Sequence, residues 1–239
     1  KGEGQVFELA EARTSTYADG KVVGTSTPTL GNVETFTHPI TGLLHWTVSE
    51  TVASPIWRLW QEGSRHEWAW GCPHCHRYFI PRFQHLWWAE KSTPDQARLS
   101  AKVKCPSCEG LIDDHQKSAL NATGCFIAPG QWVDEHGVVQ GEADTTSTDT
   151  ASFWVSGICS FSPKKTFGFL AKKFLSAVKS GEPERIQGVI NTDFGECFAI
   201  GGDAPEWTAV LDRKQDYVVG QVPTGVNCLT AGVDVQKNR

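Results

Sequence analysis

The sequence predicts a mixed α/β protein that carries an inserted four-cysteine module. Two pairs of the form Cys-Pro-x-Cys, at residues 72–75 and 105–108, have the spacing of a metal site. A helix, a turn and a strand are predicted over residues 5–25, and residues 228–236 form an apolar run with strand character. Helices and strands that alternate along the chain are typical of the α/β class.

Composition indicates a globular protein with a substantial core. Of the 239 residues, 39% are apolar, with ten Trp and twelve Phe. No stretch approaches the roughly 18 apolar residues of a membrane helix, so we expect no membrane association. The net charge of −5 argues against a protein that coats nucleic acid without specificity. The chain has no methionine and no secretory signal, and we expect an internal piece of a longer protein in a reducing compartment.

The first elements are a helix over residues 5–18 and a short strand over residues 21–25, with the sequence Lys-Val-Val-Gly-Thr. The strand ends on the hydroxyl-rich loop Ser26-Thr27-Pro28-Thr29. Ligands bind at the carboxyl ends of strands in α/β sheets, so this loop is a candidate ligand contact.

Two further elements precede the cysteines. Residues 43–48 give the best strand pattern of this region. Ser54-Pro55 predicts the start of a helix, which Gly63 ends.

The two cysteine pairs predict one structural zinc ion. Four cysteines are the commonest all-sulfur ligand set for structural zinc. Residues 76–104 exceed the usual spacing of about 15–20, but closing a longer loop costs only about 0.6 kcal/mol per doubling of length. The predicted ligands are Cys72, Cys75, Cys105 and Cys108.

Two other uses of these cysteines stay open. A redox pair needs one Cys-x-x-Cys beside a βαβ unit, and a rubredoxin-like iron site would use the same four sulfurs. Recurrence of the motif with its proline favours structural metal. His74 and His76 flank the first pair, and we expect both at the surface, directed away from the metal.

The predicted module has the layout of a zinc ribbon. Strands at residues 67–70 and 78–80 flank the first pair. Thr93-Pro94-Asp95-Gln96 matches a capping box with proline at the first helical position. Asp113-Asp114 predicts the start of a helix over residues 115–121.

Residues 134–150 are polar and predict an exposed loop or linker, and a strand follows at residues 153–155. Ser162-Pro163 predicts the start of a long helix that ends at Gly181, and a shorter helix covers residues 183–190. The long helix carries Lys164, Lys165, Lys172, Lys173 and Lys179, which would contact phosphates or, more commonly, solvate the helix surface. The isolated cysteines, expected as buried and unreactive thiols, are Cys125, Cys159, Cys197 and Cys228.

The order of these motifs resembles the large terminase subunit of tailed bacteriophages, the GpA (lambda-type) family. The similarity spans nearly the whole chain. Its motifs are Ser26-Thr27-Pro28-Thr29, Gly71-Cys72-Pro73-His74-Cys75, Phe153-Trp154 before Phe161-Ser162-Pro163, Val189-Ile190-Asn191-Thr192 before Phe194-Gly195-Glu196, and residues 229–236 (Leu-Thr-Ala-Gly-Val-Asp-Val-Gln).

The resemblance implies a division of the chain. Residues 1–70 would be the C-terminal part of a P-loop ATPase-type core, and residues 71–125 a zinc-ribbon-like module. Residues 126–222 would form a connecting subdomain of helices and strands. Residues 223–239 would be the first strand of an RNase H-like nuclease domain.

The resemblance also implies a function. The large subunit is an ATP-driven motor that moves DNA into an empty capsid, and a metal-dependent endonuclease that cuts concatemeric DNA. Ser26, Thr27 and Pro28 match the motif that couples ATP hydrolysis to DNA movement. Asp234 matches the first acidic residue of the nuclease centre, whose two-metal chemistry needs several carboxylates.

The implied cofactors are structural Zn²⁺, together with Mg²⁺ and ATP for the complete protein. The implied partners are double-stranded DNA, the small terminase subunit, the portal of the procapsid and further copies of the subunit. The resemblance implies a phage or prophage protein of the host cytoplasm.

The sequence departs from the family pattern in two respects. It contains no G-x-x-x-x-G-K-[ST] phosphate loop, so we expect the chain alone to bind ATP poorly and to leave DNA uncut. His76 and Glu109 stand where glycine commonly follows the second ligand of a knuckle. A left-handed backbone there costs on the order of 1 kcal/mol for a residue other than glycine.

Two other functions stay open. The first is a zinc-ribbon module that binds nucleic acid or protein without catalysis, for which a stronger basic face would be expected. The second is a metal-containing enzyme whose ribbon braces an unrelated active site.

Overall fold

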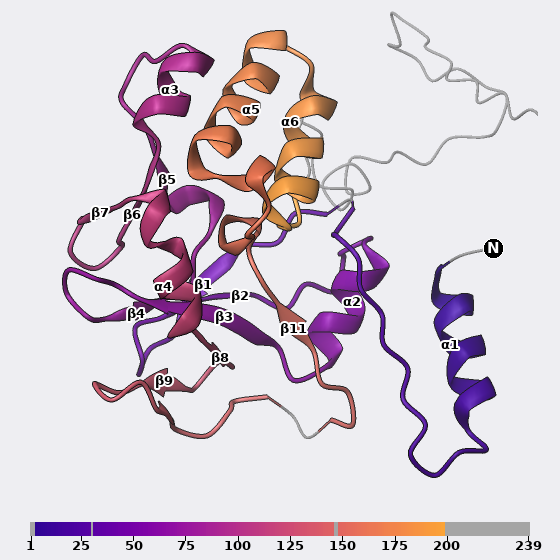
Figure 1. Cartoon of the computed structure of the whole chain (residues 1–239). Helices are drawn as coiled ribbons and strands as arrows, with labels where there is room; N and C mark the ends of the chain where they lie inside the picture. Colours follow the sequence, from indigo (N-terminus) through magenta and orange to yellow (C-terminus); the bar gives the residue numbers. More distant parts are fainter. Residues whose placement is uncertain (1–2, 30, 146–147, 199–239) are drawn as a thin grey trace, which may run out of the picture. The chain divides into compact units, whose positions relative to one another are not determined.

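Strand β3 (His66–Gly71) is the centre of the fold, because three other strands pair with it (Figure 1). The computed structural model describes residues 3–29, 31–145 and 148–198. Strand β11 (Phe153–Trp154) runs parallel to the start of β3, and β8 (Cys125–Ile127) runs antiparallel to its middle. Strand β4 (Tyr78–Phe79) pairs antiparallel with its end. The mixed α/β class is therefore confirmed.

The N-terminal part differs from the prediction at its strand. Helix α1 covers Glu3–Thr14, so it ends four residues before the predicted end at residue 18. The strand predicted over residues 21–25 is wrong: this stretch has no regular secondary structure, pairs with none of the described strands, and leaves Val23 83% exposed. A β-branched run becomes a strand only where another strand supplies its hydrogen bonds.

Strand β2 (Leu44–Trp46) and helix α2 (Pro55–Glu62) match their predictions, whereas strand β1 (Thr35–Thr37) was not predicted. Strands β1 and β2 form an antiparallel hairpin. Helix α2 has proline in its first turn and ends at Gly63. Trp57 and Trp60 lie on its buried face, which explains the strongly amphipathic pattern.

The first cysteine pair lies in the turn between β3 and β4, and the second pair lies in a turn of a second antiparallel sheet, with the order β5 (Leu86–Trp87), β6 (Lys102–Lys104), β7 (Leu111–Ile112). Helix α3 (Pro94–Ser100) lies within the metal loop. Its predicted capping box is confirmed, because the Thr93 and Gln96 side chains each bond the backbone of the other.

Helix α4 (Lys117–Ala122) follows the second cysteine pair and is preceded by a 3₁₀ turn at Asp114–Gln116. The segment after β8 contains a hairpin of β9 (Trp132–Val133) and β10 (Val139–Gln140), and β10 lies within residues 134–150, where a loop was expected. The Asp134 carboxylate accepts hydrogen bonds from the backbone amides of His136 and Val138 and so stabilises the turn between β9 and β10.

The long helix α5 (Phe167–Ser180) begins later than predicted. Ser162-Pro163 starts only a 3₁₀ turn at Pro163–Lys165, and Thr166 is the cap of α5. Three of the five lysines pair with acids, because Lys172 bonds Asp95 while Lys165 and Lys173 bond Asp193. These ion pairs leave α5 without a continuous free basic face.

Helix α6 (Pro183–Val189) continues into a π-helical turn at Ile190–Phe194. Gly195, with a φ of 73°, ends this turn in the left-handed conformation that glycine adopts without strain.

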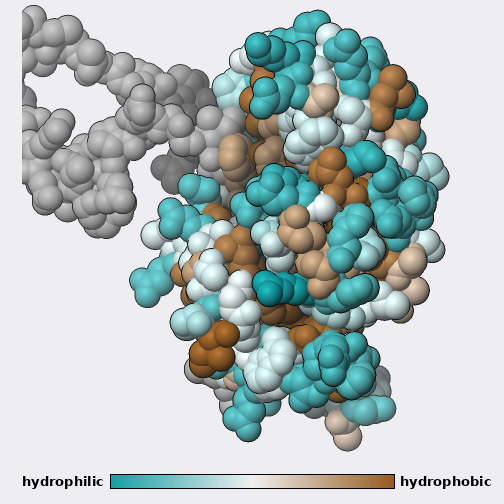
Figure 2. All heavy atoms as spheres, turned by 90° about the vertical axis from the view of Figure 1, so that its left-hand side faces the viewer, coloured by the Kyte–Doolittle hydropathy of each residue, from teal (hydrophilic) through white to brown (hydrophobic). Residues whose placement is uncertain are grey.

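Two hydrophobic clusters form the core. The first joins the cysteine module to α5 and α6, with Val103, Cys105 and Ile112 packed with Phe167 and Leu170. The second joins β2, α2 and β3 through Trp46, Trp57 and Ala69. On the face seen in Figure 2, hydrophobic side chains reach the surface only in small groups among hydrophilic ones. No helix in the described part of the chain has the length and apolar character needed to cross a membrane.

Candidate functional site

The four predicted cysteine ligands converge on one point. The Sγ atoms of Cys72, Cys75, Cys105 and Cys108 all lie within 4.8 Å of one another. Cys72 Sγ lies 3.8 Å from Cys108 Sγ, and Cys75 Sγ lies 3.9 Å from Cys105 Sγ. A tetrahedral ion with metal–sulfur bonds of about 2.3 Å needs sulfurs about 3.8 Å apart. The arrangement therefore fits a four-coordinate metal ion, while a disulfide would need a sulfur separation of about 2.05 Å.

The two cysteine turns repeat the same backbone geometry. The His74 and Ser107 amides each donate to the sulfur of the first cysteine of their pair, at 3.4 Å. The His76 and Glu109 amides each donate to the carbonyl of that cysteine. His76 and Glu109 have φ of 59° and 60°, so the left-handed position predicted at each turn is confirmed with residues other than glycine.

Burial makes two of the four thiols, those of Cys72 and Cys105, poor acids when no metal is bound. Burial raises the pKa of Cys72 to about 12 and also raises the pKa of Cys105. A hydrogen bond from the Gly110 amide lowers the pKa of the exposed Cys108 to about 7. A bound cation favours the thiolate form of all four residues, so metal binding would release protons.

The other histidines and cysteines lie outside this cluster. His74 and His76 are exposed, as predicted, and His74 Nε2 contacts the Leu111 carbonyl oxygen at 3.1 Å. Cys159 and Cys197 are buried and Cys125 is half-buried. Burial raises the pKa of Cys197 to about 12, which agrees with the expected unreactive thiol. Cys228 lies outside the described residues.

The predicted loop at residues 26–29 has no regular secondary structure and is mostly open to solvent. Ser26 and Thr27 are exposed, while Pro28 is buried. Both backbone polar groups of Thr29 are bonded: its amide donates to Ser54 Oγ at 3.1 Å, and its carbonyl oxygen accepts from Asn191 Nδ2. The loop thus presents two exposed hydroxyl-bearing side chains next to an anchored residue, and Ser26 Oγ donates to the Thr27 carbonyl oxygen at 3.1 Å. Asp234, the predicted nuclease residue, lies outside the described residues.

A buried charge network around Glu67 of β3 was missed by the sequence reasoning. Glu67 Oε1 accepts from Arg82 Nη2 at 2.6 Å, and Glu67 Oε2 lies 2.5 Å from His45 Nδ1. The Arg82 guanidinium lies over two indole rings that contact each other edge to face, 4.1 Å from the centre of Trp46 and 5.1 Å from that of Trp154. Polar Glu67 within an aromatic strand was the one available signal.

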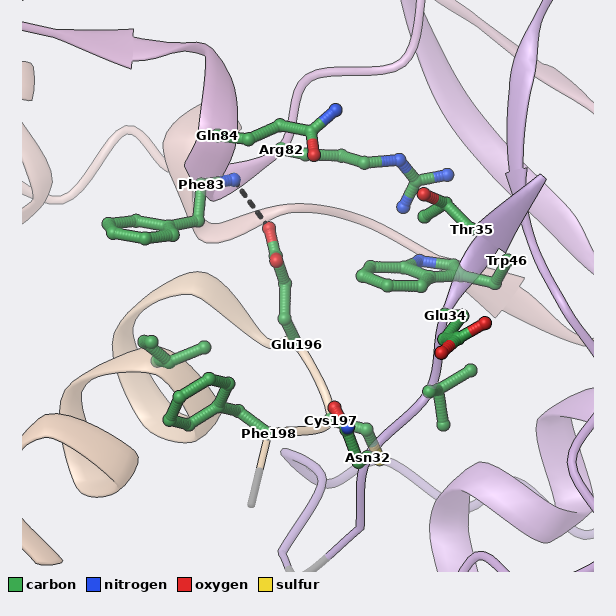
Figure 3. Close-up of a pocket in the computed structure, with 12 residues that line it drawn as sticks. Asn32, Glu34, Thr35, Trp46, Arg82, Phe83, Gln84, Glu196, Cys197 and Phe198 are labelled. Atoms are coloured by element: carbon green, nitrogen blue, oxygen red, sulfur yellow. Dashed lines mark hydrogen bonds between the residues drawn. The ribbon is translucent and has the colours of Figure 1, made fainter. Parts of the chain in front are cut away.

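A cavity of about 380 Å³ opens next to Arg82. Residues of three chain segments line it, at positions 32–35, 82–84 and 196–198, together with Trp46 and Ile190 (Figure 3). Glu196 points its carboxylate toward Phe83, whose amide donates to Glu196 Oε1 at 2.5 Å. Burial raises the pKa of Glu196 to about 7, against the opposing effects of the Phe83 amide and the Arg82 charge.

Comparison with protein families explains why these segments occur in one chain. The model described as phage terminase large subunit gpA, ATPase domain, matches residues 1–132. The model described as terminase large subunit gpA, endonuclease domain, matches residues 150–239. No curated protein and no solved structure gave a significant match. Since the ATPase model alone spans more than half of the 239 residues and both models describe one subunit, the chain belongs to the phage terminase large subunit gpA family of DNA-packaging enzymes.

Proposed function

We propose that this chain is the part of a terminase large subunit in which the ATP-driven motor is joined to the nuclease around one structural zinc ion. The observation that carries the proposal is the pair of family matches, to an ATPase domain over residues 1–132 and to an endonuclease domain over residues 150–239. The four-cysteine cluster lies within the ATPase match and packs against α5 of the endonuclease match.

Zinc is the metal that the cysteine cluster fits best. An all-sulfur tetrahedral set is typical of structural zinc, and all four positions belong to the protein, so no position is left open for a substrate. Cys72, Cys75, Cys105 and Cys108 would hold the ion in a zinc-ribbon-like module over residues 71–125. The ion would hold together the two cysteine turns, at residues 72–75 and 105–108, next to the core of the module.

Ser26, Thr27 and Pro28 are proposed to couple ATP hydrolysis to DNA movement. Two exposed hydroxyls beside an anchored Thr29 support this role, because they can respond to a phosphate while the end of the loop transmits the change. The ATPase core would end near residue 70, and ATP would bind with Mg²⁺ mainly through residues other than those of this chain.

Asp234 is proposed as one acidic residue of an RNase H-like nuclease centre that begins at residues 223–239. A two-metal site needs further carboxylates, so the chain by itself would not cut DNA. Residues 126–222 would connect this centre to the zinc module. The expected partners are double-stranded DNA, the small terminase subunit, the portal of the procapsid and further copies of the subunit, in the host cytoplasm.

The test of the coupling role is Thr27→Val in the complete large subunit, with Thr25→Val as the matched control at an exposed position just outside the motif. Thr27→Val should keep ATP hydrolysis and lose DNA packaging, whereas Thr25→Val should keep both. Packaging by Thr27→Val at the wild-type rate per ATP would refute the assignment. No observation favours a zinc-ribbon binding module without catalysis over this function.

A further inference from the structure

Two hydrogen bonds connect the ATPase-matched and endonuclease-matched segments at residues 190–198. Asn191 Nδ2 donates to the carbonyl oxygen of Thr29, and Glu196 Oε1 accepts from the Phe83 amide at 2.5 Å. Thr29 and Phe83 belong to the segment that matches the ATPase domain, and Asn191 and Glu196 to the segment that matches the endonuclease domain. Residues 190–198 are therefore hydrogen-bonded both to Thr29, at the end of the Ser26–Thr29 loop, and to Phe83, in the segment that follows β4.

Asn191 is buried, and both polar groups of its side-chain amide are hydrogen-bonded. The residue is 5% exposed. While Nδ2 bonds Thr29, Oδ1 accepts from the Phe198 amide at 3.0 Å. Asn191 lies in the π-helical turn Ile190–Phe194, and such turns are rare and occur frequently at functional sites.

The turn that carries Asn191 is itself held firmly. The buried Asp193 carboxylate pairs with Lys173 at 2.5 Å and with Lys165 at 3.4 Å. Phe194 is fully buried, with its ring centre 4.9 Å from that of Phe83. A shift of Thr29 would therefore be resisted by the whole turn and transmitted through the Asn191 amide.

The space beside this connection is open. The cavity of about 380 Å³ separates residues 32–35 from residues 196–198 (Figure 3). Cys197 still packs with Val33 and Trp46 in one buried cluster, and the hydrogen bonds of Asn191 and Glu196 add directional contacts. A hydrogen bond weakens steeply when its geometry changes.

We propose that Asn191 is a positioning residue that transmits the state of the Ser26–Thr29 loop to residues 190–198, and so to the endonuclease segment. The proposal rests on the coupling role proposed above for that loop. In physical terms, the Asn191 side-chain amide bonds both the Thr29 carbonyl and the Phe198 amide, so a displacement of Thr29 would also displace the backbone at Phe198.

The decisive variant is Asn191→Asp in the complete large subunit. Aspartate keeps an oxygen that accepts from the Phe198 amide but replaces the donor that faces the Thr29 carbonyl by an oxygen. Asn191→Ala removes both contacts. Thr192→Ala is the matched control, because Thr192 is the exposed neighbour in the same turn.

The measurement is the number of ATP molecules hydrolysed per base pair packaged, with the melting temperature recorded for each variant. Asn191→Asp and Asn191→Ala should raise this ratio by about 2- to 30-fold, and Thr192→Ala should leave it unchanged. A merely structural role would lower the melting temperature and reduce hydrolysis and packaging together at a constant ratio. A wild-type ratio in Asn191→Asp would overturn the proposal.

Thr27→Val and the double variant Thr27→Val/Asn191→Asp separate this proposal from the coupling role itself. If Thr27→Val uncouples packaging and Asn191→Asp does not, the loop keeps its role and the Asn191 connection is refuted. If Asn191→Asp uncouples while Thr27→Val does not, the connection stands and the assignment of Thr27 fails. Effects that are clearly non-additive in the double variant would support one shared path.

Hydrogen exchange on the 239-residue chain gives a second readout that needs no packaging reaction. Asn191→Asp should speed exchange of amides in residues 31–35, which follow the anchored Thr29, whereas Thr192→Ala should not. Unchanged exchange there in Asn191→Asp would contradict the proposed connection.

Discussion

Glu67 and Arg82 form a fully buried ion pair, with Glu67 Oε1 2.6 Å from Arg82 Nη2 and side-chain exposures of 0% and 1%. The pair joins the central strand β3 to the segment that follows β4. His45 reaches the second oxygen of the same carboxylate, and the carbonyl of Leu44 accepts from Arg82 Nη2 at 2.9 Å. This network fixes the β1–β2 hairpin against the sheet.

Arg82→Met should destabilise the protein strongly. Loss of one partner leaves a charged carboxylate buried without its cation, which costs about 3–5 kcal/mol. The double variant Glu67→Gln/Arg82→Met should recover part of that loss, because it removes the stranded charge as well. Urea unfolding of the 239-residue chain measures both. Arg77→Met is the control at an exposed arginine, and a loss in Arg82→Met no larger than in this control would contradict the prediction.

Cys105→Ser should remove the metal and lower stability together. The reduced wild-type chain should contain about one zinc ion by elemental analysis, and a chelator should unfold the module because ligand binding and folding are linked. A loss of about 3 kcal/mol would lower the melting temperature by roughly 6–12 °C. Cys125→Ser, at a half-buried thiol outside the cluster, should keep its zinc. Metal-free wild-type protein after careful reduction would count against the site.

Asp234→Asn should abolish DNA cleavage in the complete large subunit. An amide binds a divalent cation far more weakly than a carboxylate, so cleavage should fall to background while ATP hydrolysis continues. Plasmid cutting and phosphate release, measured on the same preparation, check both. Asp149→Asn changes an exposed aspartate in the same way and should cut at the wild-type rate. Retained cleavage in Asp234→Asn would refute its role.

Glu196→Gln should change how stability depends on pH. Burial raises the pKa of Glu196 from 4.5 to about 7, so the folded chain holds this proton more tightly than the unfolded chain does. The contribution of Glu196 to stability is therefore favourable at low pH and is lost as pH rises from about 4.5 through about 7. A glutamine still accepts from the Phe83 amide and does not ionise.

The difference in unfolding free energy, Glu196→Gln minus wild type, should therefore increase between pH 4.5 and pH 8 by on the order of 3 kcal/mol. Unfolding free energies of both proteins at pH 4.5, 6 and 8 test this. Groups other than residue 196 titrate in both proteins, so the difference between the two isolates Glu196. A difference that stays constant with pH would show that the buried carboxyl group keeps its ordinary pKa.

Local signals predicted local structure well. The Thr93 capping box, the Ser54-Pro55 helix start and both cysteine turns depend on residues a few positions apart, and each was placed correctly. The long helix is preceded by two residues that can each cap a helix. Ser162 Oγ accepts from the Lys164 amide and caps a 3₁₀ turn, while Thr166 Oγ1 accepts from the Phe169 amide and caps the helix itself.

Features that depend on distant residues could not be predicted in this way. The strand expected at residues 21–25 has the right composition, but none of the described strands supplies its hydrogen bonds. The partners of Glu67 lie 22 and 15 positions away, and no periodic pattern links them. From the sequence, Asn191 was interpreted only as part of a helix end. Its contact with Thr29 spans 162 positions, so no local pattern could predict it.

The parallel pairing of β3 with β11 carries a consequence for how this enzyme can be divided. Phe153 lies opposite His66 and Trp154 opposite Glu67, so one sheet is shared by the two family-matched halves. Proteolytic nicking between residues 134 and 150 would leave two pieces that stay associated through this ladder. Each half expressed alone would expose an unsatisfied strand edge prone to aggregation, so truncations for biochemical work should begin or end outside this shared sheet.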